Sequence, residues 1–539
     1  MKPWLAWMGG ASLAAAAAAG TFSYLRGQQD RAMQDSAALQ RLDNDVQAAA
    51  TLRTLKANAR SGLITIRNVI LIDAAQERSI PGQTVIVRGE KIVWLGPNAQ
   101  APQLDGGTDI DGAGHYLSPS LVDMHVHTEG LAQHVLRLAA GVTSARDMDG
   151  MPWLLRMRDA IVSGRMIGAT PYVAGTIIAD QPLDGYAVVA KSVDDARQIV
   201  RNQSKCGYAF IKVHNSLAQP LLDAVADEAR RNGLDLVGHV PHDISLQHAI
   251  QVDHMRTVEH LKGFFSDRDF EPSTEPFAAA LTGAEVWVTP TLYTRRQFAY
   301  GDEARSILAD PRSRYVPWYQ RLQDSRDMAE PGSERAKTYD RYVASQTTVM
   351  GRLIPLNVHW LVGTDAAGYP FNVAGFATLD ELQLLHAAGL SNGEIIRAAT
   401  SEAAMAMRKS SEFGRIAVGM RADFILLATD PLRNVAAYAE NLGVMARGRW
   451  FDRKSLDAAL TEIARQYDSH RADGITPSAA TLLAQNIQAS AKAGFVFEDS
   501  ALDAGAVAFE HNHAQNAARR LRSLLSAPRS GVCAADLPN

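Results

Sequence analysis

The stretch Leu121-Val-Asp-Met-His-Val-His127 decides which fold and which chemistry we expect from this chain. It is a short apolar run that ends in a His-x-His pair. On a β-strand, side chains two residues apart point to the same side, so His125 and His127 would project together while Val126 faces away. Neutral imidazole is a common ligand for zinc and related metals. The stretch therefore predicts half of a metal site at the end of a strand.

From residue 117 onward, short strand patterns alternate with helical patterns, which is typical of parallel strands joined by crossover helices. Eight candidate strands follow one another, at residues 121–127, 141–147, 171–178, 209–214, 234–240, 257–260, 286–292 and 359–365. Eight such units between residues 117 and 410 predict an α/β fold, a (β/α)8 TIM barrel. In that fold the chemistry takes place at the carboxyl ends of the strands.

Strand-like segments flank this central part on both sides. Residues 61–116 contain two strand patterns and a hairpin turn at Arg88-Gly-Glu-Lys91, and residues 411–453 contain two further strands. We therefore expect a flanking β-sandwich domain formed from both chain ends. A long charged insertion at residues 293–356 is either a solvated helical pair or a lid over the strand ends.

The chain begins with an apolar, Ala-rich segment that carries no charge between Pro3 and Gly20 and follows a short basic start. Residues 1–26 are therefore predicted to be a signal peptide or a membrane anchor. Either alternative implies an exported protein, periplasmic or membrane-anchored and facing the periplasm. A helical linker at 27–60 and a helical C-terminal extension at 454–539 complete the predicted organisation.

Composition narrows the range of partners. The 539 residues are 47% hydrophobic and 21% charged, as in globular proteins with large cores. The net charge of −4 argues against nucleic acid or an anionic membrane surface as the main partner, so a small-molecule substrate is expected. Two cysteines, Cys206 and Cys533, are too few for a disulfide framework and are either paired or free. A homo-oligomer is compatible with these properties.

Metal-binding side chains recur at the ends of the later strands. In addition to the first pair, these ends carry Lys212, His239, His260 and Asp365. Each has a structural alternative, because a single buried histidine is usually a core residue and an aspartate after Gly-Thr usually caps a helix. Lys212 is harder to dismiss, since a buried ammonium group is costly unless it is paired or neutralised. Together the six positions predict one polar site at the barrel mouth.

With these residues the sequence resembles the amidohydrolase superfamily, most of all its imidazolonepropionase-like and prolidase-like branch. The resemblance covers residues 63 to about 450. The matching segments are residues 123–127, 141–147, 211–213, 238–241, 258–260, 363–365, 380–385 and 414–423. Two departures limit it: true imidazolonepropionases lack a lysine at the position of Lys212, and Val240-Pro241 replaces a tyrosine of some prolidase-like members.

The resemblance implies a binuclear centre with two divalent metal ions, for which Zn²⁺ is expected. It places His125 and His127 with Asp365 at the more buried ion and His239 and His260 at the more exposed one. Lys212 would be N6-carboxylated and would bridge both ions, which also removes the unfavourable buried cation. All these residues are metal ligands by resemblance, and Asp365 would in addition be catalytic.

We expect a metal-dependent hydrolase that cleaves a C–N bond, amide, peptide or cyclic amide, with a metal-bridging hydroxide. Asp365 would accept the proton and pass it to the leaving nitrogen. The alternatives are hydrolysis of ester, lactone or phosphoester bonds on the same centre, and a binding protein on a degenerate barrel. Two residues are weaker candidates for substrate binding: Arg146, which could instead be held by Asp147, and Tyr293, a candidate wall of the pocket.

Overall fold

The structure is a computed structural model that describes residues 34–148, 150–183, 187–266, 270–327, 330–366, 371–468, 477–512 and 514–525. The predicted export segment at 1–26 and Cys533 lie outside these residues. Export therefore stays a prediction, and whether Cys206 and Cys533 are paired stays open. Within the described part of the chain, we find no helix whose length and apolar character would allow it to span a bilayer.

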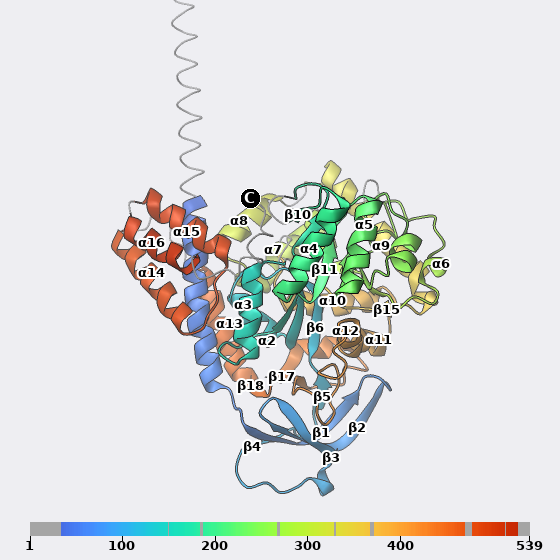
Figure 1. The fold of residues 1–539 in the computed structure, drawn as a ribbon. Coiled ribbons are helices and arrows are strands. Elements are labelled where there is room, and N and C mark those ends of the chain that lie inside the picture. The colour runs from blue at the N-terminus through green and yellow to red at the C-terminus, as the bar shows by residue number, and fades with distance from the viewer. Residues whose placement is uncertain are drawn as a thin grey trace, which may run out of the picture.

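The centre of the molecule consists of parallel strands surrounded by helices (Figure 1). One sheet has the order β6 (Leu121–Val126), β7 (Val142–Asp147), β8 (Thr170–Val173). The other has the order β10 (Ala187–Val189), β9 (Ile177–Ala179), β11 (Phe210–Val213), β12 (Asp235–Gly238), β13 (Thr257–Glu259), β14 (Trp287–Thr289), β15 (His359–Trp360). Parallel bridges join Ala174 to Phe210 and Val126 to Ala366, so the two sheets meet at both edges. This is a TIM-barrel-like α/β fold.

The central strands are buried on both faces. Every residue of β6, β7 and β11 is buried, as expected for parallel strands covered by helices on one face and by the barrel interior on the other. The covering helices are α2 (Ala132–Ala139), α3 (Pro152–Val162), α4 (Val193–Cys206), α5 (Gln219–Arg231), α6 (Phe277–Leu281), α10 (Phe376–Ala387), α11 (Asn392–Ala398) and α12 (Ser401–Ala406), with η2 (His248–Val252) between β12 and β13. The strand predicted at 171–178 is divided into β8 and β9, and the Gln203 side chain lies against Gly175 between them.

Both chain segments outside the barrel form one eight-stranded sheet. Its strands are β1 (Leu63–Asp73), β2 (Arg78–Arg88), β3 (Lys91–Pro97), β4 (Thr108–Asp111), β5 (Tyr116–Pro119), β16 (Phe424–Leu427), β17 (Asn441–Ala446) and β18 (Arg449–Asp452), with η1 (Asn98–Gln100) and η6 (Val435–Glu440). The two segments meet where β5 pairs antiparallel with β16. The predicted hairpin is confirmed by the pairing of Arg88 with Lys91. The strands share one hydrogen-bonded sheet with its own apolar cluster, and β5 extends past the predicted boundary at residue 116.

A helical layer joins the two ends of the chain. Residues 34–58 form a helix that lies beside α13 (Arg453–Asp468), α14 (Pro477–Lys492), α15 (Asp499–His511) and α16 (Gln515–Leu525) in Figure 1. Leu42 is fully buried against Gly505, and Gln466 donates to the hydroxyl of Thr51 at 3.1 Å. The Asp45 carboxylate accepts from the backbone N–H of Leu131 at 2.8 Å. The segment predicted as a linker is therefore packed onto the barrel.

The insertion is packed as well. It comprises η3 (Leu292–Phe298), α7 (Gly301–Ala309), η4 (Pro311–Tyr315), α8 (Trp318–Asp327), α9 (Glu334–Leu353) and η5 (Ile354–Leu356). Val349, Met350 and Leu353 of α9 belong to the main apolar core, and Tyr315 stacks on Phe376 of α10 at 5.4 Å between ring centroids. A purely solvated helical pair is thus wrong, and movement of the insertion as a lid stays a prediction.

Candidate metal centre

The predicted ligands gather at the carboxyl ends of the strands. Asp365 is central: its Oδ1 lies 2.9 Å from Nε2 of His127 and 3.3 Å from Nε2 of His125, and its Oδ2 lies 3.9 Å from Nε2 of His260. One ligand atom each from His125, His260 and Asp365 lies within 4.8 Å of the others. His127 is the more accessible group, with 22% of its side chain exposed.

The remaining predicted ligands complete the same cluster. Lys212 is buried, and its Nζ lies 3.5 Å from Nε2 of His125. The ring of His239 lies 4.9 Å from that of His260, with centroids as end points, and 4.2 Å from that of His214. All six positions chosen from the sequence therefore converge on one mouth, and His214 joins them.

Backbone hydrogen bonds hold two of these ligands in an uncommon conformation. His260 and Asp365 both have φ of 58°, in the left-handed region that non-glycine residues seldom adopt. The backbone N–H of His260 donates to Thr289 O at 2.9 Å, and that of Asp365 donates to His125 O at 2.7 Å. Such strain persists where the surroundings fix it, and it concentrates at functional sites.

A second layer of polar groups orients the imidazole rings. Nδ1 of His125 is bound to Glu259 at 2.9 Å, Nδ1 of His239 to Asn215 at 2.5 Å and Nδ1 of His260 to Thr291 at 2.7 Å. The hydroxyl of Thr291 donates to Pro290 O, so it accepts from His260. Because each Nδ1 carries the proton, each Nε2 keeps its lone pair for a metal, as is usual for metal-binding histidines.

Arg146 belongs to this second layer, and the prediction that it contacts substrate is wrong. The side chain is fully buried and donates to Met124 O at 2.6 Å, to the Thr257 hydroxyl at 2.8 Å and to Glu259 at 2.5 Å. The carboxylate that holds Arg146 is that of Glu259, which in turn binds His125. Burial opposes ionisation of Glu259, but the Arg146 charge and the His125 hydrogen bond outweigh it and lower its pKa.

Tyr293 does not line the mouth either. Its side chain is buried, and its hydroxyl accepts from Arg296 at 2.6 Å. It lines a separate cavity of about 290 Å³ together with Arg312 and Asp380, and none of the six predicted ligands lines that cavity. The backbone N–H of Tyr293 donates to Glu381, which fixes the start of the insertion.

The sequence analysis assigned no role to several residues that shape the centre. Asp123 accepts from the hydroxyls of Thr364 and Thr378 at 2.7 and 2.8 Å, which ties β6 to the segment that ends in Asp365. Glu259, Asn215 and Thr291 orient the rings. Glu259 directly precedes His260 of the predicted constellation, so adjacency was an available signal for Glu259, whereas Asn215 adjoins His214, which is not one of the six predicted ligands. Nothing in the sequence pattern marks Thr291.

The charge states of the cluster suit divalent metal ions. Burial, assisted by the charge of Lys212, lowers the pKa of His125 to about 4, and burial holds the pKa values of His239 and His260 well below their usual range. The three imidazoles are therefore neutral. Burial alone would raise the pKa of Asp365, but the neighbouring imidazoles and the hydrogen bond from His127 keep it well below its usual value. Neutral imidazoles around a carboxylate form a donor set that fits zinc.

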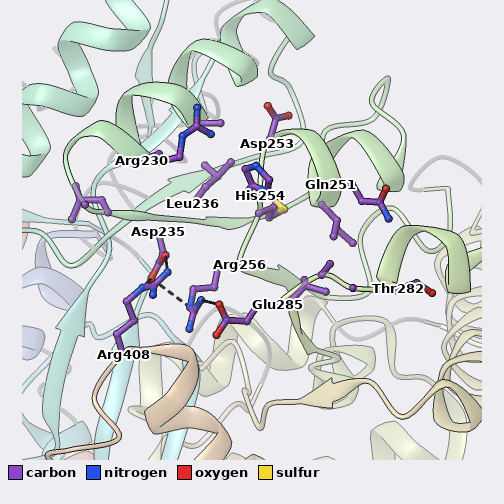
Figure 2. Close-up of a pocket in the computed structure, with 18 residues that line it drawn as sticks. Arg230, Asp235, Leu236, Gln251, Asp253, His254, Arg256, Thr282, Glu285 and Arg408 are labelled. Atoms are coloured by element: carbon purple, nitrogen blue, oxygen red, sulfur yellow. Dashed lines mark hydrogen bonds and ion pairs between the residues drawn. The ribbon is translucent and has the colours of Figure 1, made fainter.

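A spacious cavity lies elsewhere, at the amino ends of the strands (Figure 2). It has a volume of about 770 Å³ and is bordered by residues at the starts of β12, β13 and β14. Its arginines are already bound: Arg408 donates to Asp235 through two nitrogens at 2.9 Å, and Arg256 donates to Glu285 at 3.1 Å. None of the six predicted metal ligands lines this cavity.

Comparisons with known proteins agree with this geometry. The model of the amidohydrolase family matches residues 116–451, more than half of the chain. A bottromycin amidohydrolase structure is 27% identical with a TM-score of 0.62, over 78% of this chain and 93% of that one. A putative prolidase from Bifidobacterium longum is 20% identical with a TM-score of 0.59, over 75% of this chain and 99% of that one, which bears on the fold alone.

Curated relatives match over shorter segments. An imidazolonepropionase from Arthrobacter sp. (strain FB24) is 25% identical over 181 residues, which are 33% of this chain and 40% of that protein. An adenine deaminase from Rubrobacter xylanophilus is 36% identical over 93 residues, which are 17% of this chain and 15% of that protein. The chain thus spans less than half of either relative.

The chain belongs to the amidohydrolase family. It is accordingly an enzyme of a metal-dependent hydrolase family, and the family predicted from the sequence is confirmed.

Proposed function

We propose that this enzyme hydrolyses a carbon–nitrogen bond, an amide, a peptide or a cyclic amide, in a small-molecule substrate. The observation that carries the proposal is the convergence of four histidines, Lys212 and Asp365 at the carboxyl ends of the strands of an amidohydrolase-family chain. Structural neighbours described as a bottromycin amidohydrolase and an Xaa-Pro dipeptidase support amide or peptide substrates. The bridges from Ala174 to Phe210 and from Val126 to Ala366, which link the two parallel sheets, support a fully closed (β/α)8 barrel.

We assign one divalent ion, with zinc as the expected metal, to His125, His127 and Asp365, and a second to His239 and His260. When bound, such ions activate water as a nucleophile and polarise the substrate carbonyl. N6-carboxylation of Lys212 would place an anionic oxygen ligand between the two groups. The burial of Lys212 supports this, because a buried ammonium group is costly and carboxylation would replace it by an anionic group.

Asp365 is the proton carrier in this proposal. Its carboxylate is ionised in the resting site, since its pKa is held well below the usual value, and it lies among the ligands on the side of the partly exposed His127. It would take the proton of the attacking water and deliver it to the leaving nitrogen, first as general base and then as general acid. Asp123 and the bond from Asp365 N–H to His125 O fix the strand end that positions it.

A hydrolysis screen tests the function. Purified protein, supplied with zinc and bicarbonate, is incubated with dipeptides, N-acyl amino acids and cyclic amides, and released amine is measured. We expect release from one of these groups and loss of that release in Asp365→Asn. Activity on ester or phosphoester substrates with none on amides would contradict the proposal while leaving the metal assignment intact.

We also propose export, on the strength of the apolar, uncharged segment that follows Lys2. Cell fractionation tests it. Recovery of the full-length chain in the cytosolic fraction would contradict the proposal.

A further inference from the structure

A second group of metal-binding side chains lies on the outside of the barrel. Asp223 comes from α5, whereas His248 and Asp253 come from the connection between β12 and β13. Nε2 of His248 lies 2.8 Å from Oδ1 of Asp223 and 3.4 Å from Oδ2 of Asp253. One ligand atom of each of the three residues lies within 4.8 Å of the others. Donors held by a tetrahedral zinc ion at ~2.0–2.1 Å are themselves about 3.3 Å apart, so the spacing suits one ion.

A π-turn produces this arrangement. Residues His248–Val252 form a π-helix, and the backbone N–H of Asp253 donates to His248 O at 3.1 Å. In an α-helix, residues five apart are rotated by about 140° and point to different sides. The wider turn brings His248 and Asp253 to the same side, facing Asp223. Single π-turns of this kind occur frequently at functional sites.

One carboxylate oxygen of Asp253 is buried and accepts no hydrogen bond. The residue is only 4% exposed, and its Oδ2 accepts no hydrogen bond. The nearest donor, Nε2 of His248, has a single proton in the neutral ring, and its shorter contact is to Asp223. A buried carboxylate oxygen with no donor is costly, because water no longer solvates it. A cation between the three groups would bind both carboxylates and the imidazole lone pair.

We infer that Asp223, His248 and Asp253 bind one divalent transition-metal ion, a peripheral site separate from the mouth. Three protein ligands and a water molecule would complete a tetrahedral zinc site. Asp223 is half exposed, so the ion can enter from solvent. The ion would join α5 to the segment that leads into β13, and β13 is followed directly by His260 of the metal centre. The peripheral ion is therefore expected to stabilise this part of the barrel wall.

Neighbouring charges permit a cation at this position. Figure 2 shows Asp253 and Arg230 at the same edge of the large cavity. Besides His248, the positive group that acts on the Asp253 carboxylate is Arg230, which is itself bound to Asp227 at 3.1 Å. The two carboxylates of the site outnumber this one arginine.

The test is metal counting on the full chain. Wild-type protein and His248→Ala are stripped with chelator, equilibrated with Zn²⁺ and desalted, and zinc per chain is measured by mass spectrometry. We expect the variant to bind one ion fewer than wild type. Asp223→Asn, a change on an exposed helix surface, provides a second variant whose folding is not at risk. The matched control is His254→Asn, which removes a neighbouring imidazole and keeps a residue type that tolerates its φ of 55°.

A thermal readout separates this site from the mouth. Zn²⁺ is added to chains that carry His125→Ala and His127→Ala, so that the proposed catalytic centre is disabled. We expect a zinc-dependent rise in melting temperature that Asp223→Asn abolishes and His254→Asn retains. Equal zinc content in wild type and both site variants, or a zinc response that survives in Asp223→Asn, would overturn the inference. Neither result bears on C–N bond hydrolysis.

Discussion

The two ends of the same barrel strands differ in a way that identifies the functional one. At the carboxyl ends, a crowded cluster around Asp365 presents neutral imidazole nitrogens and a carboxylate to one another. At the amino ends lies a cavity of about 770 Å³ whose arginines Arg256 and Arg408 already have carboxylate partners. Volume is therefore a poor guide to function in this protein. A better guide is a set of metal-donor atoms that are held in position but are not used in structural hydrogen bonds.

Arg256 illustrates the structural role of the amino ends of the strands. Its three nitrogens donate to Ala406 O at 2.8 Å, to Met405 O at 3.0 Å and to Glu285 at 3.1 Å, and its guanidinium lies 4.5 Å from the centre of the Trp287 ring. This arginine connects the barrel to the helices that follow it. The contrast predicts that changes at the carboxyl ends alter catalysis, whereas changes at the amino ends alter stability.

The largest effect is expected for Asp365→Asn. The amide keeps the shape of the side chain but cannot carry the proton, so kcat should fall about 10²–10⁴-fold. Circular dichroism and the melting temperature should stay close to those of wild type. Turnover within tenfold of wild type would remove the proposed role of Asp365 and weaken the contrast between the two ends.

Asp45→Asn probes the polar contact beside the mouth. Burial raises the pKa of Asp45 to about 7, so wild type loses stability as pH rises from about 4 through 7, because the unfolded chain releases this proton more readily. The variant lacks this loss and should be more stable than wild type at pH 8 by on the order of 2–4 kcal/mol. Urea unfolding at pH 5 and pH 8 measures the difference, and an equal gain at both values would contradict the assignment.

Arg256→Met addresses the opposite end. The variant leaves two carbonyls and nearby carboxylates without their donor and should lower the free energy of unfolding by about 2–3 kcal/mol. Turnover of the folded fraction should stay within twofold of wild type. Chemical unfolding and amine release at saturating zinc check the two statements, and a hundredfold loss of kcat in folded protein would break the comparison.

Thr291→Val removes the acceptor of His260 without changing the shape of the side chain. Loss of such an orienting group typically weakens metal binding 10–100-fold, and here it should affect the ion assigned to His239 and His260. Competition with a chelating dye measures the affinity. Thr294→Val, a buried hydroxyl three residues along the chain, is the matched control and should leave the affinity unchanged.

Arg408→Ala should have the smallest effect. Its side chain is 61% exposed, and its paired contact with Asp235 is a surface ion pair worth less than about 1 kcal/mol. Neither kcat nor the melting temperature should change measurably. A strong loss of activity would show that the large cavity participates in function after all.

The sequence by itself determined the class of fold and which six side chains lie together at one end of the strands. Both follow from local patterns: apolar runs of strand length set the parallel strands, and the last residues of each run must lie at one end of the barrel. His125, Lys212 and Asp365 could therefore be placed together although they are far apart in the chain. A local pattern is also sufficient for the Ser-x-x-Glu capping box at Ser391 and Glu394, which begins α11 in the structure.

Tertiary structure alone decided which groups bind which. Arg146 and Glu259 are 113 residues apart, and no local pattern indicates that this pair would hold His125 or that Arg146 would be withdrawn from substrate. The packing of residues 34–58 against the last helices and the contact between Asp223 and His248 also join parts of the chain that no local pattern links. A sequence pattern reports which face of a strand or helix is buried, whereas the partner of a buried polar group depends on what the folded chain brings within about 3 Å of it.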